Sequence, residues 1–486
     1  MKLIYRKASG IMILLLLAQF VSCSERENVT PETTEPDVTV SESQQNEYDF
    51  ADLDFGGSEF NFLNTVTNWG FYYSIDFEEE TGEKLDDAIY ARNRLVEEKY
   101  NFILSVTEDD YANTATTIYN LVMAGDNQYQ AALLPPETLT PLLSDNCFVN
   151  LSDISELQLD MPWWDNARNE ISSIGNSDKL YFAASDFSLV GIEGIMCTFI
   201  NKRMMSELGQ EMPYQQVRDG KWTLDAMYEL MKLGASLNGD ESFEWKYDGS
   251  SIYGLVGGDG SIRGLIDGAG ASFVVKGDDG LPQIAFEDEH FFEVAEKITT
   301  MMSQDGEWLH LGLNQERDHY EVAFANSRAL MTVAEIKGSS RMRDMVDDYG
   351  IVPNPKYDES QEEYYAYVPS HCPAFCIPTT NTEPNKISAI MDALSYYSYH
   401  NVVPVFYDES LSQKRLRDEE SIEMLSLMRE IRHFDLGTCY GWTNQLQIQT
   451  SNEMMKNTGS LSSLLAENKE MIIESINKTL DELVTD

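Results

Sequence analysis

The sequence predicts an α/β protein with more than one folded unit. Short apolar runs alternate with segments whose apolar residues recur at three-and-four spacing, which is the pattern of strands alternating with helices. The chain has 486 residues, of which 42% are hydrophobic and 24% charged. This composition supplies a core, and this length suggests two or three globular units. The chain is therefore expected to fold rather than to remain an unstructured acidic polymer.

The first predicted unit begins at residue 60. Its expected elements, in chain order, are a strand at 60–62, a helix at 85–96, a strand at 102–106, a helix at 115–122 and a strand at 131–134. Strands that alternate with helices in this way indicate a parallel sheet covered by helices on both faces. In such sheets, ligands bind beyond the carboxyl ends of the strands.

A second region begins near Tyr181. A central strand is expected at 195–200, and a helix is expected after Thr223, whose hydroxyl suits the N-cap position. Residues 248–280 hold many glycines around a strand at 252–256, which predicts a loop-rich and functional segment. The later elements are a helix at 291–302, a strand at 375–377, a helix from Pro384, and amphipathic helices at 424–431 and 461–483.

The N-terminus has the layout of an export signal. Basic residues precede an apolar run at 11–18, and Val-Ser-Cys follows, ending at Cys23. The run is shorter than the about 20 residues that span a bilayer. Val-Ser-Cys resembles a bacterial lipobox, which implies removal of residues 1–22 and lipidation of Cys23. Residues 23–49 are rich in Glu, Thr, Ser and Pro, which predicts a disordered polar tether. The alternative is an ordinary signal with an unrelated cysteine.

The charge balance excludes nucleic acid as a partner. The chain has 34 Lys and Arg against 82 Asp and Glu, for a net charge of −48. A surface this anionic repels phosphate backbones, and nucleic-acid proteins need basic stripes.

Neither a disulfide framework nor a metal or cofactor site is predicted. The cysteines beyond Cys23 are odd in number and are expected to be buried thiols: Cys147, Cys197, Cys372, Cys376 and Cys439. The run His371 to Cys376 lacks a second ligand pair at zinc spacing. The acidic runs at Asp259 and Asp278 lack the closing Glu of a calcium loop, so we interpret them as turns.

Several short motifs occur in a recognisable order. They are Phe199-Ile200-Asn201-Lys202, Gly220-Lys221-Trp222-Thr223-Leu224-Asp225, Phe324 to Met331, and an apolar strand followed by a helix at Pro384-Asn385-Lys386. In this order the chain resembles the extracellular solute-binding proteins of family 1, which serve carbohydrate importers of the ABC type. The resemblance implies a two-lobed, periplasmic-binding-protein-like (type II) fold with a hinge and an interlobe cleft. Ligand binding in the cleft would shift the lobes from open to closed.

The resemblance also implies an organisation and partners. Lobe one would comprise residues 50–185 plus 367–410, and lobe two residues 186–366 plus 411–486. The expected partners are a carbohydrate ligand and the transmembrane permease subunits of an ABC importer. The protein would be a monomer without enzymatic activity, exported and lipid-anchored to the outer face of the cell membrane.

Two alternative functions stay open at this point. One is a surface-anchored glycan-degrading enzyme, because the many acidic residues always allow a pair of catalytic carboxylates to be imagined. The other is a peptide or amino-acid receptor of the same fold, in which an Asp and Arg pair binds the ligand's charged groups. Asp259 and Arg263 would suit that role.

Candidate ligand-binding residues in lobe one follow the predicted strands. A sugar site combines aromatic platforms with side chains that bond pairs of hydroxyls. Trp69 and Tyr72 lie in the loop after the first strand, and Glu137 lies after the third. Asp186 precedes the first expected hinge crossing, where it would accept a ligand hydroxyl or form a hinge hydrogen bond.

Lobe two supplies the other candidates. Asp259 and Arg263 lie in the glycine-rich loop, where the resemblance implies sugar contacts. Glu335 ends a strand that carries an aromatic platform in many family members, so here it is expected to bind hydroxyls instead. Trp442 lies in a glycine turn and is either a platform or part of the core. The Trp163-Trp164 pair is interpreted as a structural wedge.

Overall fold

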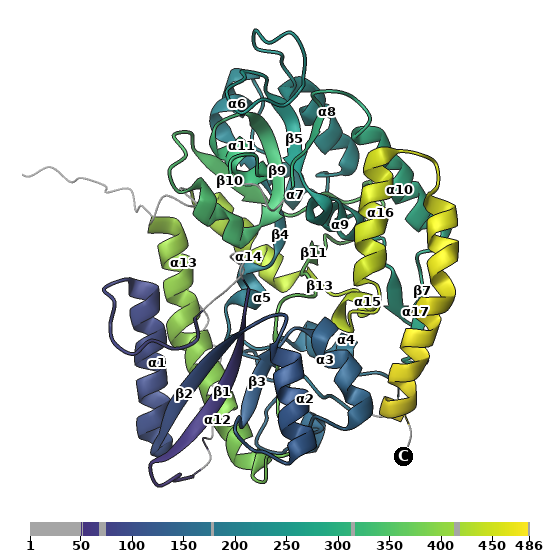
Figure 1. The fold of residues 1–486 in the computed structure, drawn as a ribbon. Helices are drawn as coiled ribbons and strands as arrows, with labels where there is room; N and C mark the ends of the chain where they lie inside the picture. The colour runs from purple at the N-terminus through teal and green to yellow at the C-terminus, as the bar shows by residue number, and fades with distance from the viewer. Residues whose placement is uncertain are drawn as a thin grey trace, which may run out of the picture. The chain divides into compact units, whose positions relative to one another are not determined.

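Two separate sheets, each with its own helices, organise the part of the chain that the structure describes (Figure 1). The computed structural model describes residues 50, 52–67, 74–175, 179–312, 316–412 and 418–484. The predicted signal segment, Cys23 and the predicted tether lie outside the described residues.

The first sheet has the strand order β12-β3-β1-β2. Its strands are β1 (Ser58–Val66), β2 (Phe102–Asp110), β3 (Ala131–Leu134) and β12 (Ala374–Cys376). The parallel pairing predicted for β1, β2 and β3 is confirmed, and β12 adds an antiparallel edge. The helices α1 (Lys84–Tyr100) and α2 (Thr114–Ala124) connect the parallel strands. Gly125 ends α2 in the left-handed region at φ +67°, which glycine adopts readily.

Short helical segments follow β3. They are α3 (Pro136–Leu139), two 3-10 turns (Thr140–Asp145 and Leu151–Asp153) and α4 (Asn166–Ser172). Proline at the first position of α3 suits a helix start, because the missing N–H has no partner there in any case. Helix α3 therefore starts directly at the carboxyl end of β3.

The second sheet has the strand order β10-β4-β9-β5-β8. Its strands are β4 (Met196–Asn201), β5 (Tyr253–Gly257), β8 (Trp308–His310), β9 (Ala329–Glu335) and β10 (Tyr349–Val352). Strand β5 runs parallel to β8 and β9, while β4 runs antiparallel to β9 and β10. Every residue of β4 is buried, which agrees with the central strand predicted there.

Several helices accompany this second sheet, and some of them pack directly on its strands. They are α5 (Val190–Glu193), α6 (Lys202–Glu207), α7 (Tyr214–Arg218), α8 (Leu224–Gly234), α9 (Asp259–Gly268), α10 (Glu289–Met301) and α11 (Tyr320–Ala325). Thr223 caps α8 by accepting a hydrogen bond from the N–H of Ala226 at 3.3 Å, as predicted. Gly254 lets α8 approach β5, because a Cβ there would lie 2.2 Å from the carbonyl oxygen of Met231.

One expectation for this region is wrong. Asp259 and Arg263 were predicted to lie in a glycine-rich loop, but Asp259 begins α9 and Arg263 lies one turn along it. The apolar side chains of Ile262, Leu265 and Ile266 are buried and hold the helix against its sheet. Burial of this apolar face outweighs the low helix propensity of the glycines.

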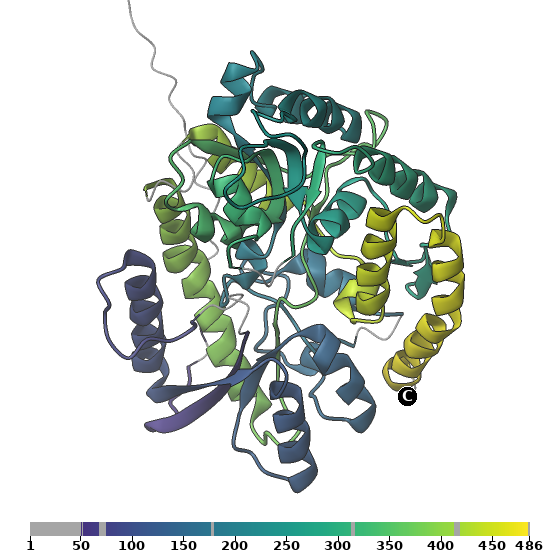
Figure 2. The ribbon, with the colours of Figure 1, turned by 45° about the horizontal axis from the view of Figure 1, so that its top comes forward.

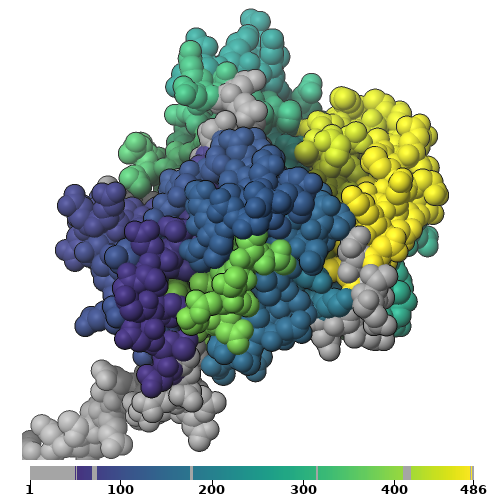
Figure 3. All heavy atoms as spheres, turned by 60° about the horizontal axis from the view of Figure 1, so that its bottom comes forward, coloured from purple at the N-terminus to yellow at the C-terminus, as the bar shows by residue number. Residues whose placement is uncertain are grey.

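The chain returns to the first sheet after β10. Beyond β12, α12 (Pro384–Tyr397), a π-helical turn (Ser398–Val402) and α13 (Val403–Ser412) pack against α1. Residues of α12 consequently lie on the surface among residues from the first third of the chain (Figure 3). Helix α14 (Glu419–Glu430) then packs on β10 of the second sheet. Strands β11 (Ala366–Tyr367) and β13 (Arg432–His433) pair where these crossing segments meet.

The C-terminal helices contact both parts of the fold. They are α15 (Leu436–Cys439), α16 (Asn444–Lys456) and α17 (Leu461–Val484). Helix α16 packs on α9 and α10, whereas α17 packs on α16 and on the 3-10 turn Thr140–Asp145 (Figure 2). Lys469 of α17 also pairs with Glu287, next to α10, at 2.5 Å. A hairpin of β6 (Val274–Lys276) and β7 (Pro282–Ile284) lies on the same side, where the N–H of Gly175 donates to the carbonyl oxygen of Gly280.

The five cysteines that follow Cys23 in the chain are free and buried, as expected. Among the described helices, none combines the length and the apolar character needed to cross a bilayer.

Candidate functional site

Glu137 lies at the carboxyl end of β3, within the first turn of α3. Its carboxylate accepts hydrogen bonds from the hydroxyls of Ser370 (2.5 Å) and Tyr111. Burial raises the pKa of Glu137, while the Ser370 hydrogen bond and the charges of His371 and Arg263 act in the opposite direction. The carboxylate of Glu137, which follows a strand of the first sheet, therefore interacts electrostatically with Arg263 of α9, which packs on the second sheet.

Three predicted residues from the second sheet and its helix α9 lie near this carboxylate. Asp259 and Arg263 form an ion pair along α9, with 3.0 Å between Oδ2 and Nη2. Glu335 ends β9 and lies 3.3 Å from Nε2 of His371. We call Glu137, Asp259, Arg263, Glu335, Ser370 and His371 the interlobe cluster. In it, side chains from both sheets meet around one crossing segment of the chain.

Arg263 is the arginine of this cluster and is only partly exposed. Its side chain is 16% exposed, and its Nε makes no hydrogen bond with the described part of the chain. Burial acts to lower the pKa of Arg263, but the nearby Tyr367, Asp259 and Glu335 raise it above its usual range. The guanidinium therefore stays charged, and the exposed part of its side chain can contact a ligand.

Asp186 lies elsewhere, at the crossing into the second sheet. Its Oδ2 lies 2.6 Å from Nη2 of Arg429, and the neighbouring Asp165 and Arg432 form a second pair at 2.9 Å. Burial raises the pKa of Asp186 to about 6 against the influence of the two arginines. Asp186 is thus engaged in an ion pair with Arg429 of α14.

Trp442 is largely buried at the edge of a cavity and does not present an open ring face on which a sugar could stack. Only 8% of it is exposed, its ring stacks on Tyr440 with 4.7 Å between centroids, and its Nε1 donates to the hydroxyl of Thr479. Together with Glu137 it lines a cavity of about 260 Å³. The other two predicted aromatic residues, Trp69 and Tyr72, lie outside the described residues.

The fold is similar to that of solved sugar-binding proteins, although no family model and no curated protein matches the chain. A cyclo/maltodextrin-binding protein complexed with maltotetraose superposes with a TM-score of 0.56 at 10% identity, covering 88% of this chain and 96% of that one. An ABC substrate-binding protein from Listeria monocytogenes in complex with cycloalternan gives 0.52 at 11% identity, covering 88% and 100%. The maltotriose-binding protein of Thermus thermophilus gives 0.51 at 12% identity, covering 86% and 98%. The chain has a two-lobed, periplasmic-binding-protein-like fold. Its lobes are built on the two sheets.

The sequence analysis singled out neither Ser370 and His371 as members of the cluster nor Tyr111 as a hydrogen-bond partner of Glu137. His371 was considered only as a metal ligand, and within the described residues no group of three or more His, Cys, Asp or Glu side chains could hold a metal ion. Ser370 lies 233 positions from Glu137 in the chain. Only the return of the chain through the interlobe region brings them together.

Two buried residues, Glu321 and His319, lie near the cluster, and Glu321 interacts electrostatically with its member Glu335. Glu321 forms an ion pair with Arg341, with 3.0 Å between its Oε2 and Nε of the arginine. Burial raises the pKa of Glu321 to about 8, opposed by Arg341 and reinforced by Glu335. His319 caps α11, since its Nδ1 accepts a hydrogen bond from the N–H of Glu321. Burial, with a contribution from Arg341, lowers the pKa of His319 to about 4.

We expect His319 to make folding sensitive to acid. A histidine whose pKa is lower in the folded state than in the unfolded state stabilises the fold above its ordinary pKa of about 6.5, and this stability is lost as the pH falls towards 4. Between pH 7 and pH 5 the expected loss is about 2 kcal/mol. Urea unfolding of the natural protein and of His319→Asn at both pH values measures it. Asparagine retains a capping oxygen but does not titrate, so equal losses in both proteins would contradict the assignment.

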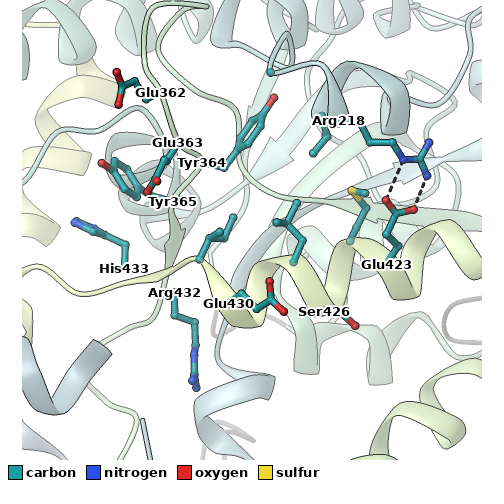
Figure 4. A pocket seen from close by; sticks show the side chains of 15 residues that line it. Arg218, Glu362, Glu363, Tyr364, Tyr365, Glu423, Ser426, Glu430, Arg432 and His433 are labelled. Carbon is teal, nitrogen blue, oxygen red and sulfur yellow. Dashed lines mark hydrogen bonds and ion pairs between the residues drawn. The ribbon is translucent and has the colours of Figure 1, made fainter. Parts of the chain in front are cut away.

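A larger cavity lies at the crossing segments, away from the predicted residues. It measures about 940 Å³, and none of the predicted ligand-binding residues lines it. Figure 4 shows Arg218 paired with Glu423 on one side, and Tyr365 beside His433 on the other. Glu362, Glu363 and Glu430 add acidic groups to its lining. The cavity lies beside the β11–β13 pair, on segments that connect the lobes.

Proposed function

We propose that this protein is the substrate-binding component of an ABC importer, which captures a sugar or oligosaccharide between its lobes and closes by hinge motion. The observation that carries the proposal is the interlobe cluster. Its carboxylates and arginine come from both lobes and lie at the carboxyl ends of β3 and β9 and at the start of α9. Such side chains bond the paired hydroxyls of sugars. A ligand that contacts both lobes favours the closed state, because only that state offers all the contacts.

The related structures support a binding protein rather than an enzyme. The three similar proteins are binding proteins, and they were solved with cycloalternan, maltotetraose and maltotriose. At 10 to 12% identity, similarity shows the fold but not the function. The separate argument for a sugar ligand is the interlobe cluster of this chain.

The remaining features belong to the same proposal. Lobe one would comprise residues 50–185 plus 367–410, and lobe two residues 186–366 plus 411–486, with Asp186 and Arg429 at the hinge. The chain would be exported, anchored through a lipid on Cys23 and held off the membrane by residues 23–49. It would act as a monomer and deliver its ligand to the transmembrane permease subunits.

A ligand screen tests this function. The lipid-free protein from Ser24 onward is offered mono- and oligosaccharides, amino acids and short peptides, and thermal unfolding is followed. A ligand of the native state at 100 times its Kd adds about 2.7 kcal/mol to the free energy of unfolding. We expect a saturable upward shift with one class of glycan. Glu335→Gln should weaken it, whereas Glu470→Gln on the exposed face of α17 should not.

Two outcomes would overturn the proposal. Release of products from a polysaccharide, without a saturable shift for any sugar, would favour a glycan-degrading enzyme. A shift only with amino acids or peptides would favour a receptor of that class.

A further inference from the structure

The C-terminal part of the chain joins the two lobes beyond the crossing segments. Helix α16 packs on α9 and α10, which accompany the second sheet. Helix α15 packs instead on α3 and α4, which follow β3 of the first sheet, and α17 packs on the 3-10 turn Thr140–Asp145. We call residues 435–442 the C-terminal clasp; they comprise α15, its N-cap Asp435 and the turn that follows. The clasp contacts both lobes.

Asp435 fixes the clasp to the second lobe. Its carboxylate accepts hydrogen bonds from the N–H groups of Phe273 and Val274, at the start of β6. The ring of Phe273 packs edge to face on Phe291 of α10, with 5.0 Å between the centroids. All of these residues are buried, so we expect the clasp to move with the second lobe.

Tyr440 and Cys439 make the contact with the first lobe. The hydroxyl of Tyr440 donates a hydrogen bond to the carbonyl oxygen of Ser172, at the end of α4. The ring of Tyr440 packs edge to face on Phe182, with 5.4 Å between the centroids. Cys439 lies close to Ser172 as well, and only 2% of it is exposed. Separation of the lobes would break these contacts and expose Cys439.

Gly441 brings the clasp against the interlobe cluster. It has a left-handed backbone at φ +70°, and a Cβ on it would lie 2.4 Å from the Cα of Glu137. Glycine is therefore needed here both for the backbone conformation and for the close approach. Because Glu137 belongs to the interlobe cluster, the clasp closes against a residue of the candidate site.

We propose that the C-terminal clasp holds the lobes together in the ligand-free protein and must release the first lobe before a ligand enters. Contacts that exist only in the closed state favour that state, and Cys439, Tyr440 and Gly441 make such contacts. A ligand can enter between the lobes only when they separate, so the clasp limits the rate of association. Its effect on a ligand rests on the proposed function, whereas its effect on the lobes does not.

Gly441→Ala tests the clasp, with Gly459→Ala as the matched control. Gly459 also has a left-handed backbone, at φ +76°, but a Cβ there would meet nothing within 4 Å. Both variants gain the same kind of backbone strain, and only Gly441→Ala places a methyl group against Glu137. Small-angle X-ray scattering of the ligand-free protein should give a larger radius of gyration for Gly441→Ala than for the natural protein. Gly459→Ala should leave it unchanged.

Tyr440→Phe tests the same contact without backbone strain, because it keeps the ring and removes only the hydrogen bond to Ser172. A buried thiol reacts with N-ethylmaleimide only when its surroundings open, and peptide mass spectrometry locates the label. We expect labelling of Cys439 to be at least threefold faster in this variant, and labelling of Cys197, buried in β4, to be unchanged. Equal acceleration at both thiols would indicate general destabilisation and would contradict the inference.

The clasp and the proposed function can fail separately. If no glycan binds in the screen, yet Gly441→Ala enlarges the protein and Tyr440→Phe exposes Cys439, the clasp stands without a sugar ligand. If a glycan binds, stopped-flow measurements should show it associating at least threefold faster with Gly441→Ala than with Gly459→Ala. An unchanged radius of gyration together with unchanged labelling of Cys439 would overturn the inference, even in a protein that binds sugar. If Gly441→Ala did not fold, the labelling of Tyr440→Phe alone would decide.

Discussion

Replacing Asp392 by alanine is expected to lower the free energy of unfolding by about 4 kcal/mol. Asp392 lies on α12 with no exposed surface, and its Oδ1 accepts hydrogen bonds from Nε1 of Trp163 (2.8 Å) and of Trp164 (2.6 Å). Both indoles are themselves buried. Alanine would leave two donors without an acceptor, and each such buried donor costs about 1 to 3 kcal/mol. The measurement is the urea midpoint and slope of the variant at neutral pH.

Asp392→Asn provides the matched control. The amide oxygen of asparagine retains an acceptor for the indoles, so we expect a smaller loss of about 1 to 2 kcal/mol. If both variants were as stable as the natural protein, the tryptophan pair would not depend on this carboxylate. The interpretation of Trp163-Trp164 as a structural wedge would then lose its physical basis.

That wedge shows what local sequence determines in this fold. Strands and helices with a clear apolar period were predicted where they occur, because burial of one face requires that period. The N-cap of α8 at Thr223 and the end of α2 at Gly125 were also predictable, since capping and left-handed backbone depend on single residue types. The partner of the tryptophan pair was not predictable. Asp392 lies 229 residues beyond Trp163, and no local pattern links them.

The region 257–268 shows why local composition can mislead. Its glycines suggested a loop, yet a Cβ at Gly264 would lie 2.9 Å from Nδ2 of Asn354, and one at Gly268 would lie 2.8 Å from Cβ of the same residue. These glycines allow close packing of α9 against the chain around Asn354 rather than a flexible turn. Glycine content alone does not distinguish the two uses.

The candidate site was predictable only in part, for a related reason. The rule that ligands bind at the carboxyl ends of strands pointed to Glu137, and the family resemblance pointed to Glu335. The structure brings both into one cluster with Arg263. The same rule makes no prediction for segments that cross between the two sheets. Ser370 and His371 lie on such a segment, and Asp186 lies on another, where it pairs with Arg429. Crossings are set by tertiary structure, so their contacts could not be predicted from periodicity.

The second large effect is expected for Arg263→Met. Arg263 is the cation that faces Asp259 directly and lies near Glu137 and Glu335. Methionine retains most of the apolar stem but leaves these carboxylates without their counter-charge. Breaking a buried ion pair by removing one partner typically costs 3 to 5 kcal/mol, and these groups are slightly exposed, so we expect a loss of about 3 kcal/mol. Chemical unfolding measures this loss, and calorimetry with the glycan found in the screen should show affinity reduced more than tenfold.

A double variant distinguishes the two effects. Asp259→Asn combined with Arg263→Met removes both charges of the pair, so most of the lost stability should return. Glycan affinity should not return, because the guanidinium of Arg263, whose side chain is 16% exposed and can donate to ligand hydroxyls, is still missing. If the double variant bound the glycan with full affinity, Arg263 would be a structural counter-ion and not a ligand contact. The loss of affinity in the single variant would then follow from repulsion among the carboxylates that remain.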